Sequence, residues 1–316
     1  MKFKDFSLFS SSPPSLWTGF DLSGGLFAVS LSAGKPGVKP RVIKHVAVVG
    51  KDPDAFALAE LNQAVHSKGA DRTFVMARGE YQVFQVDKPA VKAEEAEKSL
   101  GWALGSLIDY PVTQANVSWL DIPHESQAAK QAKVYLVAVK KEIVDHYDQL
   151  FAKAKANLQA ADIRETGNRN IAALAESGQQ GVCLVFAEKT GVQITITFQG
   201  ELFLERFIRE PLYPEPGMST EDPEQVDRVA LEIQRSLDFI RRAYPTISIE
   251  EVTVGPTLKD IKLAHQLKSR MTEPIRQLDL SNLFEWPEGS DLTRPEVQAL
   301  YFYALGAALR GRKAAK

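Results

Sequence analysis

The sequence predicts an α/β protein of two lobes, and three patterns along the chain support this fold class. An apolar run at residues 15–20 enters a glycine-rich turn at 19–25, and the alternating stretch 26–31 follows, which predicts a β-hairpin. A second hairpin of similar form is predicted over 181–196. After each hairpin, short β-type runs alternate with stretches of helical periodicity, an order typical of α/β folds.

The elements after the first hairpin complete a first lobe, residues 15–81. The pattern predicts a strand over 41–49, a helix over 54–68 and a strand over 73–77. Residues 1–14 contain a cluster of serine and proline, which favours a flexible lead-in rather than packed structure.

A distinct block at residues 82–123 predicts a small α+β subdomain inserted in the first lobe. Its strands are expected over 82–86 and 116–121, on either side of a helix over 92–107. The short elements and their order set this block apart from the lobe that surrounds it.

The first lobe is predicted to continue over residues 124–180. A strongly β stretch at 134–139 precedes a helix over 141–157. A short helix at 169–176 then ends before Gly178, a residue typical of helix C-termini.

The second lobe is predicted over residues 181–294. Its strand at 193–198 turns at Gln199 and Gly200 into a further strand at 202–207. The spacing between these strands suits a two-residue β-turn.

A long helix follows in the second lobe. Asp222 is suited to cap it, Pro223 to occupy its first turn, and Pro245 to stop it. A strand over 249–254 and a helix that ends near Arg270 come next.

The last predicted helix spans residues 295–309 and is expected to return to the first lobe. A basic tail completes this final unit, residues 295–316. We expect the tail to be frayed and solvated.

The composition is that of an ordinary soluble protein and argues against several functional classes. With 38 Lys and Arg against 40 Asp and Glu, the net charge of -2 gives no broad basic surface for nucleic acid. Cys183 is the only cysteine, so an intrachain disulfide and a cysteine-based zinc site are excluded. No apolar segment reaches the roughly 18–20 residues needed to cross a bilayer. We therefore expect a cytoplasmic protein without a membrane span, which could associate with a membrane only through a partner.

Four strings of the sequence resemble one known family. They are Gly19-Phe20-Asp21, a strand and helix at 134–144, a helix at 231–239 and a closing helix at 304–310. Their order and spacing resemble the PilM family of actin-like pilus-assembly proteins, including the MshI members that serve the mannose-sensitive haemagglutinin (MSHA) pilus. The resemblance implies the two-lobed actin-like fold, with the small α+β subdomain inserted in the first lobe.

The resemblance also implies a nucleotide site, if binding is retained, with Asp21 contacting magnesium through Mg-ATP. The positions that match the family pattern are Gly19, Asp21, Ser23, Gly24, Gly25, Glu232, Arg235 and Gly255. Two alternatives stay open from the residues alone. Asp21 can instead cap its own turn, and Glu232 with Arg235 can form an ion pair on a solvated helix face.

Several positions depart from the family pattern and place ATP hydrolysis in doubt. Ser23 stands where the family has glycine and Ala28 where a lysine is common. In the second hairpin, Phe186 cannot bind a metal, and the charge of Glu188 would repel a triphosphate. Pro256 removes an N–H from the predicted adenine floor. We expect no cofactor, with residual binding of ATP and magnesium left open.

The resemblance further implies a partner, the N-terminal cytoplasmic peptide of a PilN-like inner-membrane protein. The candidate contacts in the inserted subdomain are Trp102, Ile108, Tyr110 and Pro111, an aromatic-rich group that suits an apolar anchor. The alternative is that each of these side chains packs in the core. Self-association and binding to the assembly ATPase stay open.

No catalytic residue is expected. The five histidines lack metal-binding spacing, and Cys183, predicted within a strand, suits a buried apolar role. We therefore expect a scaffold of an MSHA or type IV pilus assembly platform. The alternatives are an ATP-binding conformational switch in the same system and, more remotely, a small-molecule kinase of the same superfold, which the missing catalytic carboxylate in the second hairpin argues against.

Overall fold

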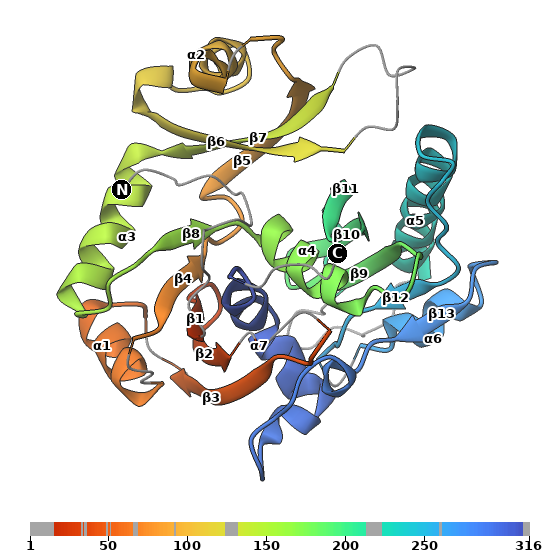
Figure 1. Cartoon of the computed structure of the whole chain (residues 1–316). Helices are drawn as coiled ribbons and strands as arrows, with labels where there is room; N and C mark the ends of the chain where they lie inside the picture. Colours follow the sequence, from red (N-terminus) through yellow and green to blue (C-terminus); the bar gives the residue numbers. More distant parts are fainter. Residues whose placement is uncertain are drawn as a thin grey trace.

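The computed structural model contains two five-stranded sheets and a three-stranded sheet within the residues that it describes (Figure 1). The predicted lead-in, the predicted cap at Asp222 and the end of the basic tail lie outside those residues. The described residues are 16–32, 34, 37–48, 50, 52–65, 69–91, 93–123, 132–212, 223–258 and 261–311.

The first lobe is built on a sheet of order β3-β2-β1-β4-β8. Neighbours β1, β2 and β3 are antiparallel, whereas β4 and β8 run parallel to β1. The strands are β1 (Leu16–Asp21), β2 (Leu26–Ser32), β3 (Arg41–Val48), β4 (Asp71–Val75) and β8 (Ala160–Asp162).

Two helices cover one face of this sheet, α1 (Ala55–Ala64) and α3 (Lys141–Lys153). Asp54 caps α1 by accepting a hydrogen bond of 2.7 Å from the backbone N–H of Ala57, as expected of an acidic N-cap. Between sheet and helices, aromatic rings such as Phe20 and Phe151, 5.5 Å apart in an edge-to-face arrangement, fill the core.

The inserted subdomain is larger than the sequence predicts. Its sheet has the order β5-β7-β6, and the central strand β7 (Lys133–Lys140) is the stretch that the sequence analysis assigned to the surrounding lobe. Strand β7 reads as a continuous apolar run because both of its faces are buried, one toward the first lobe and the other under α2 (Ala93–Leu104). The outer strands are β5 (Tyr81–Asp87) and β6 (Ala115–Ile122), with the short helix η1 (Val112–Gln114) before β6.

The second lobe carries a sheet of order β11-β10-β9-β12-β13. The turn between β10 and β11 has positive φ at both Gln199 (52°) and Gly200 (78°), which matches the predicted two-residue turn. Helices α5 (Pro223–Ala243) and α6 (Leu263–Lys268) cover one face. The strands are β9 (Val182–Glu188), β10 (Gly191–Phe198), β11 (Glu201–Ile208), β12 (Val252–Val254) and β13 (Ile275–Gln277), and η2 (Leu280–Asn282) and η3 (Asp291–Thr293) follow.

Helices α4 (Arg164–Ala175) and α7 (Pro295–Ala308) lie side by side between the two large sheets (Figure 1). They touch through glycine, since a Cβ on Gly306 would lie 2.7 Å from the carbonyl oxygen of Gly167. Helix α4 starts at Arg164, earlier than the predicted 169–176. Thr166 supports this start because its hydroxyl accepts a hydrogen bond from the backbone N–H of Ile163.

No helix within the described part of the chain is both long enough and apolar enough to cross a membrane.

Candidate functional site

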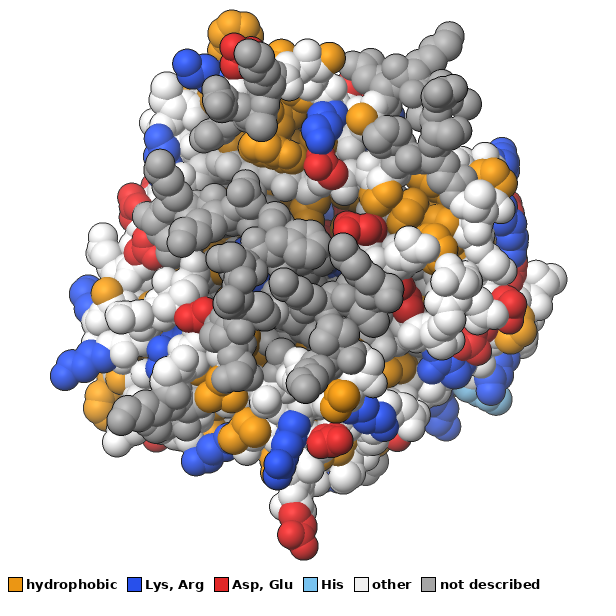
Figure 2. All heavy atoms as spheres, viewed as in Figure 1, with side chains coloured by type: hydrophobic (Ala, Val, Ile, Leu, Met, Phe, Trp, Pro, Cys, Tyr) orange, Lys and Arg blue, Asp and Glu red, His pale blue; other side chains and the backbone are white. Residues whose placement is uncertain are grey.

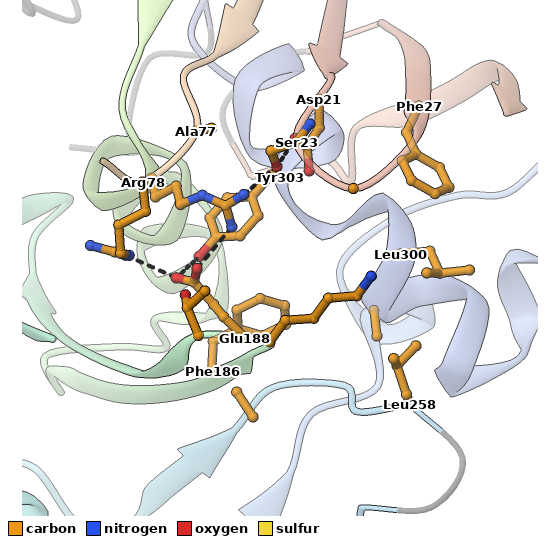
Figure 3. Close-up of a pocket in the computed structure, with 16 residues that line it drawn as sticks. Asp21, Ser23, Phe27, Ala77, Arg78, Phe186, Glu188, Leu258, Leu300 and Tyr303 are labelled. Atoms are coloured by element: carbon orange, nitrogen blue, oxygen red, sulfur yellow. Dashed lines mark hydrogen bonds and ion pairs between the residues drawn. The ribbon is translucent and has the colours of Figure 1, made fainter. Parts of the chain in front are cut away.

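The tips of the two predicted hairpins face each other across a cavity of about 190 Å³ (Figure 3). Asp21 is the last residue of β1 and Glu188 is the last residue of β9, so the two acids hold equivalent positions in their hairpins. The cavity lies between the lobes, and side chains of α4 and α7 complete its wall.

The acid at the tip of the first hairpin is held by a residue of its own turn. The Asp21 carboxylate is buried and accepts hydrogen bonds from the backbone N–H of Ser23 at 3.0 Å and from its hydroxyl at 2.6 Å. This arrangement is an Asx turn, in which a side chain replaces a backbone acceptor. Gly24 borders the cavity with open space where a side chain would be.

Glu188, at the tip of the second hairpin, is surrounded by donors. Its carboxylate accepts hydrogen bonds from Arg78 at 2.8 Å, from Arg164 at 2.9 Å and from the Tyr303 hydroxyl at 2.6 Å. The Glu188 side chain is only 4% exposed. Its charge is therefore balanced within the protein and not by solvent.

Arg78 joins the two lobes. It lies in the segment between β4 and β5, and it also donates to Glu165 at 2.8 Å and to Gln193 of the second lobe at 2.9 Å. The face of its guanidinium lies 3.7 Å from the ring centre of Phe207 on β11. Burial opposes its charge, but Glu165 and Glu188 outweigh that effect and raise its pKa, so Arg78 stays charged.

Arg164, the first residue of α4, connects the two hairpins. It donates to the Ser23 hydroxyl of the first hairpin and to Glu188 of the second, and its guanidinium lies 4.2 Å from the ring centre of Tyr303. Burial lowers its pKa, but neighbouring groups, Glu188 and Asp21 among them, raise it above the ordinary value. Figure 3 shows three of its neighbours, Ser23, Glu188 and Tyr303, between the hairpin tips.

Two tyrosines tie the inserted subdomain to this network. The Tyr81 hydroxyl, at the start of β5, donates to Glu165 at 2.8 Å and accepts from the backbone N–H of Arg164 at 3.2 Å. Burial raises the pKa of Tyr81, so the hydroxyl keeps its proton. Tyr135 on β7 accepts a hydrogen bond of 3.0 Å from the backbone N–H of Glu205 on β11.

Comparison with known proteins places this geometry in a known fold. No protein-family model and no curated protein matches the chain. Among solved structures, it is similar to a chain of the PilM–PilN type IV pilus biogenesis complex, with a TM-score of 0.70 and 16% identity over 95% of this chain and 100% of that chain. The chain has a PilM-like, actin-like fold.

Two further structures share weaker similarity. The cytoplasmic domain of EpsL, an inner-membrane component of the type II secretion system of Vibrio cholerae, gives a TM-score of 0.48 and 12% identity over 90% of this chain and 94% of that chain. A Bacteroides thetaiotaomicron protein with an actin-like ATPase fold gives a TM-score of 0.48 and 12% identity over 90% of this chain and 95% of that chain. The predicted fold class is confirmed by the similarity to the chain of the PilM–PilN complex.

The charged side chains of this cleft are already paired with one another in the observed arrangement. Glu188 at the tip of the second hairpin is paired with Arg78 and Arg164, and the Arg164 guanidinium also interacts with the nearby Asp21. The cavity is also smaller than the roughly 300–1,000 Å³ typical of ligand pockets. The described residues contain no group of three or more His, Cys, Asp or Glu suited to hold a metal.

Aromatic packing closes the region beside Gly255. The Phe186 ring stacks on Phe302 at 3.8 Å between ring centres. A Cβ on Gly255 would lie 2.7 Å from the Phe186 ring, so the lack of a side chain at this position leaves room for the ring. Gly19 has a similar packing role, because a Cβ there would overlap the Ala304 carbonyl of α7.

The structure brings together only some of the residues predicted for a nucleotide site. Asp21, Ser23 and Gly24 line the cleft, and Gly25, at φ 142°, packs its backbone against the Phe27 ring. Glu232 and Arg235 line another cavity, between β11 and α5. They form an ion pair of 2.6 Å there, as the helix-face alternative predicts.

The predicted partner residues lie in the inserted subdomain but differ in exposure. Trp102 on α2 is 86% exposed, whereas Ile108 and Tyr110 are half-buried against the core beneath α2. Pro111 is exposed at the start of η1, and the Lys140 ammonium lies 5.3 Å from the Tyr110 ring centre.

The sequence analysis missed the residues that dominate the cleft, Arg78, Arg164, Glu165 and Tyr303. None belongs to a recognisable motif, and the sequence analysis assigned no element to the start of α4. The one available signal was a charged pair, Arg164-Glu165, directly after the short apolar stretch that forms β8.

Proposed function

We propose that this chain is a non-hydrolytic scaffold of an MSHA or type IV pilus assembly platform. It would lie in the cytoplasm and be recruited to the inner-membrane face by the cytoplasmic N-terminal peptide of a PilN-like protein. The whole-length similarity to a chain of the PilM–PilN complex supports this assignment.

The observation that carries the loss of hydrolysis is the pairing of Glu188. An ATPase needs a free polar group to orient water and free cationic or amide donors to bind phosphate. Here the Glu188 carboxylate already accepts from Arg78, Arg164 and Tyr303, and the same contacts occupy both arginines. A triphosphate would have to separate these buried ion pairs before it could bind, which is unfavourable.

The exposure of Trp102 supports a partner site on the inserted subdomain. Other apolar residues of α2, such as Leu100 and Leu104, are buried beneath it, so Trp102 points away from the core that its helix covers. Tryptophan is enriched among the residues that dominate protein–protein binding energy. An apolar partner peptide would bury its ring together with Ile108, Tyr110 and Pro111.

Two titrations test the proposal. Mg-ATP added to the purified chain in a calorimeter should give no saturable binding up to millimolar concentration, and no phosphate should be released. The N-terminal peptide of a PilN-like protein should bind, and Trp102→Ala should weaken it at least tenfold. Phe56→Ala is the matched control, since Phe56 is an aromatic residue of similar exposure, 75%, on α1. Robust magnesium-dependent ATP turnover would overturn the scaffold assignment.

A second candidate is an ATP-binding switch, and the open backbone at Gly24 beside Asp21 favours it. In that case nucleotide would displace the internal ion pairs and change the lobe arrangement. Saturable Mg-ATP binding that disappears in Asp21→Ala, together with weaker peptide binding, would support the switch over the scaffold.

A further inference from the structure

A second cavity, of about 450 Å³, lies at the outer edge of the second lobe between β11 and α5. Strand β11 is the edge strand of its sheet and pairs with β10 alone among the described strands. No residue that lines this cavity also lines the cleft between the hairpins. The cavity is a separate site, and the proposed function gives it no role.

The backbone of β11 has an outward-facing edge at this cavity. In an antiparallel pair, the N–H and C=O of alternate residues point away from the neighbouring strand. Glu205 is one such residue, because its N–H donates to the Tyr135 hydroxyl of the inserted subdomain. Two residues further along, Phe207 has the same orientation, and within the described chain its N–H has no partner. The open edge therefore starts where the inserted subdomain stops covering β11.

Arginines surround this open edge. The cavity is lined by Arg206, Arg209, Arg228 and Arg235 against Glu210 and Glu232. Glu232 pairs with Arg206 at 2.7 Å and with Arg235 at 2.6 Å, and Glu210 pairs with Arg228 at 2.7 Å. Arg228 also lies 3.8 Å from Glu224. Four arginines against these three glutamates leave a local excess of one positive charge. Arg235 keeps 61% of its side chain exposed, and Arg209 forms no ion pair with a described residue.

The cavity also has an apolar floor. Leu231 on α5 is 45% exposed, which is unusual for leucine on a helix whose inner face is well packed, and it lies beside the half-buried Ile208 of β11. Figure 2 shows apolar side chains over this part of the second lobe, with basic side chains along its outer edge. An extended chain lying along β11 would meet backbone groups, an aliphatic surface and arginines together.

We propose that this groove docks a short, extended, acidic segment of a partner protein, which adds as a strand to the edge of β11. Backbone hydrogen bonds at Phe207 would supply the pairing, as in other cases of β-strand addition. An aliphatic side chain of the segment would cover Leu231 and Ile208. Its carboxylates would pair with Arg209, which has no ion pair with a described residue, and with Arg235, which shares Glu232 with Arg206. This site is independent of the inserted subdomain, so it would hold a second partner.

The test uses the full chain and a fluorescein-labelled six-residue peptide of alternating glutamate and valine, followed by anisotropy at low salt. We expect saturable binding that weakens at least tenfold in the double variant Arg209→Glu/Arg235→Glu. The matched control is Arg294→Glu, because Arg294 is 58% exposed and pairs with an acid three residues away, as Arg235 does. This control should change the affinity less than twofold. Equal melting temperatures of the variants would confirm that both remain folded.

Two altered peptides test the mode of binding. Replacing glutamate by lysine should weaken binding at least tenfold, and methylating alternate backbone amides should abolish it if the peptide pairs as a strand. The proposal is overturned if the methylated peptide binds equally well, if Arg294→Glu weakens binding as much as the double variant, or if no binding is found up to millimolar peptide. An oligothymidylate of equal charge that binds as tightly would also overturn it.

Discussion

The two hairpins that meet in the cleft both end their first strand on an acidic residue, yet the two acids are held in different ways. Asp21 takes its hydrogen bonds from Ser23, two residues away. Glu188 takes its hydrogen bonds from Arg78, Arg164 and Tyr303, which come from three separate elements. The Asp21 carboxylate is therefore held by local turn chemistry, and the Glu188 carboxylate by the assembled tertiary structure.

The largest effect should come from removing the charge at the second tip. Glu188→Gln leaves Arg78 and Arg164 buried without a full counter-charge, so the free energy of unfolding should fall by about 3–5 kcal/mol. Urea denaturation followed by circular dichroism measures it. The variant should also gain stability from added inorganic phosphate, which can pair with the released arginines, whereas the native chain should not. A loss below 1 kcal/mol would show that the Glu188 contacts contribute little.

Arg164→Met tests the residue that links the two tips. Methionine keeps part of the apolar contact with Tyr303 but removes the hydrogen bonds to Ser23 and Glu188. Because Arg78 still neutralises Glu188, we expect a smaller loss, about 2–3 kcal/mol. Hydrogen exchange should show faster exchange at both hairpin tips. Faster exchange at the second tip alone would mean that Arg164 does not connect them.

A pH titration tests the second lobe beyond its hairpin. Burial, then the charge of Glu165, raises the pKa of Glu205 from 4.5 to about 7, against the opposing effects of Gln193, Arg78 and Arg206. The folded state thus keeps a proton that the unfolded state releases. The resulting stability is fully present below about pH 4.5, falls as the pH rises and is lost above about pH 7.

Glu205→Gln should remove this pH dependence and raise the free energy of unfolding at pH 8 by about 1–3 kcal/mol. Thermal unfolding of both proteins at pH 5 and pH 8 provides the measurement. Parallel changes with pH in the two proteins would show that Glu205 is not the titrating group.

The smallest effect should come from the first tip. In Asp21→Asn, the amide oxygen can still accept both hydrogen bonds from Ser23, so the expected loss is about 0.5–1 kcal/mol. The measurement is the same urea denaturation as for Glu188→Gln. If the two substitutions cost equal free energy, the contrast between a local and a tertiary tip is wrong.

The same contrast explains which features the sequence could predict. The Asx turn at Asp21 and the turn at Gln199 and Gly200 depend on neighbours in the chain. The sequence analysis predicted the second and offered the first as the alternative to a magnesium contact. The assignment of β7 to the first lobe was wrong because its apolar run is compatible with the central strand of any sheet. Only its pairing with β5 and β6 shows that it belongs to the inserted subdomain.

The network around Glu188 could not be predicted for a related reason. Arg78, Arg164 and Tyr303 are far apart in the sequence, and each is unremarkable in its local context. Their role arises only when α4 and α7 pack between the sheets. Likewise, the period of α2 could not decide whether Trp102 faces the core or the solvent, because that depends on which side of the helix β7 covers.

The glycine contact between α4 and α7 has a mechanical consequence. Gly167 lies one helical turn from Arg164, so the point where the central helices touch is close to the ion pairs that join the hairpin tips. If the lobes rotate about this contact, the ion pairs lie close to the axis of rotation. Helix α2, at the far end of the molecule, lies distant from it (Figure 1). A small force on the inserted subdomain would then suffice to strain the ion pairs between the hairpin tips, although these pairs are strong in the undisturbed structure.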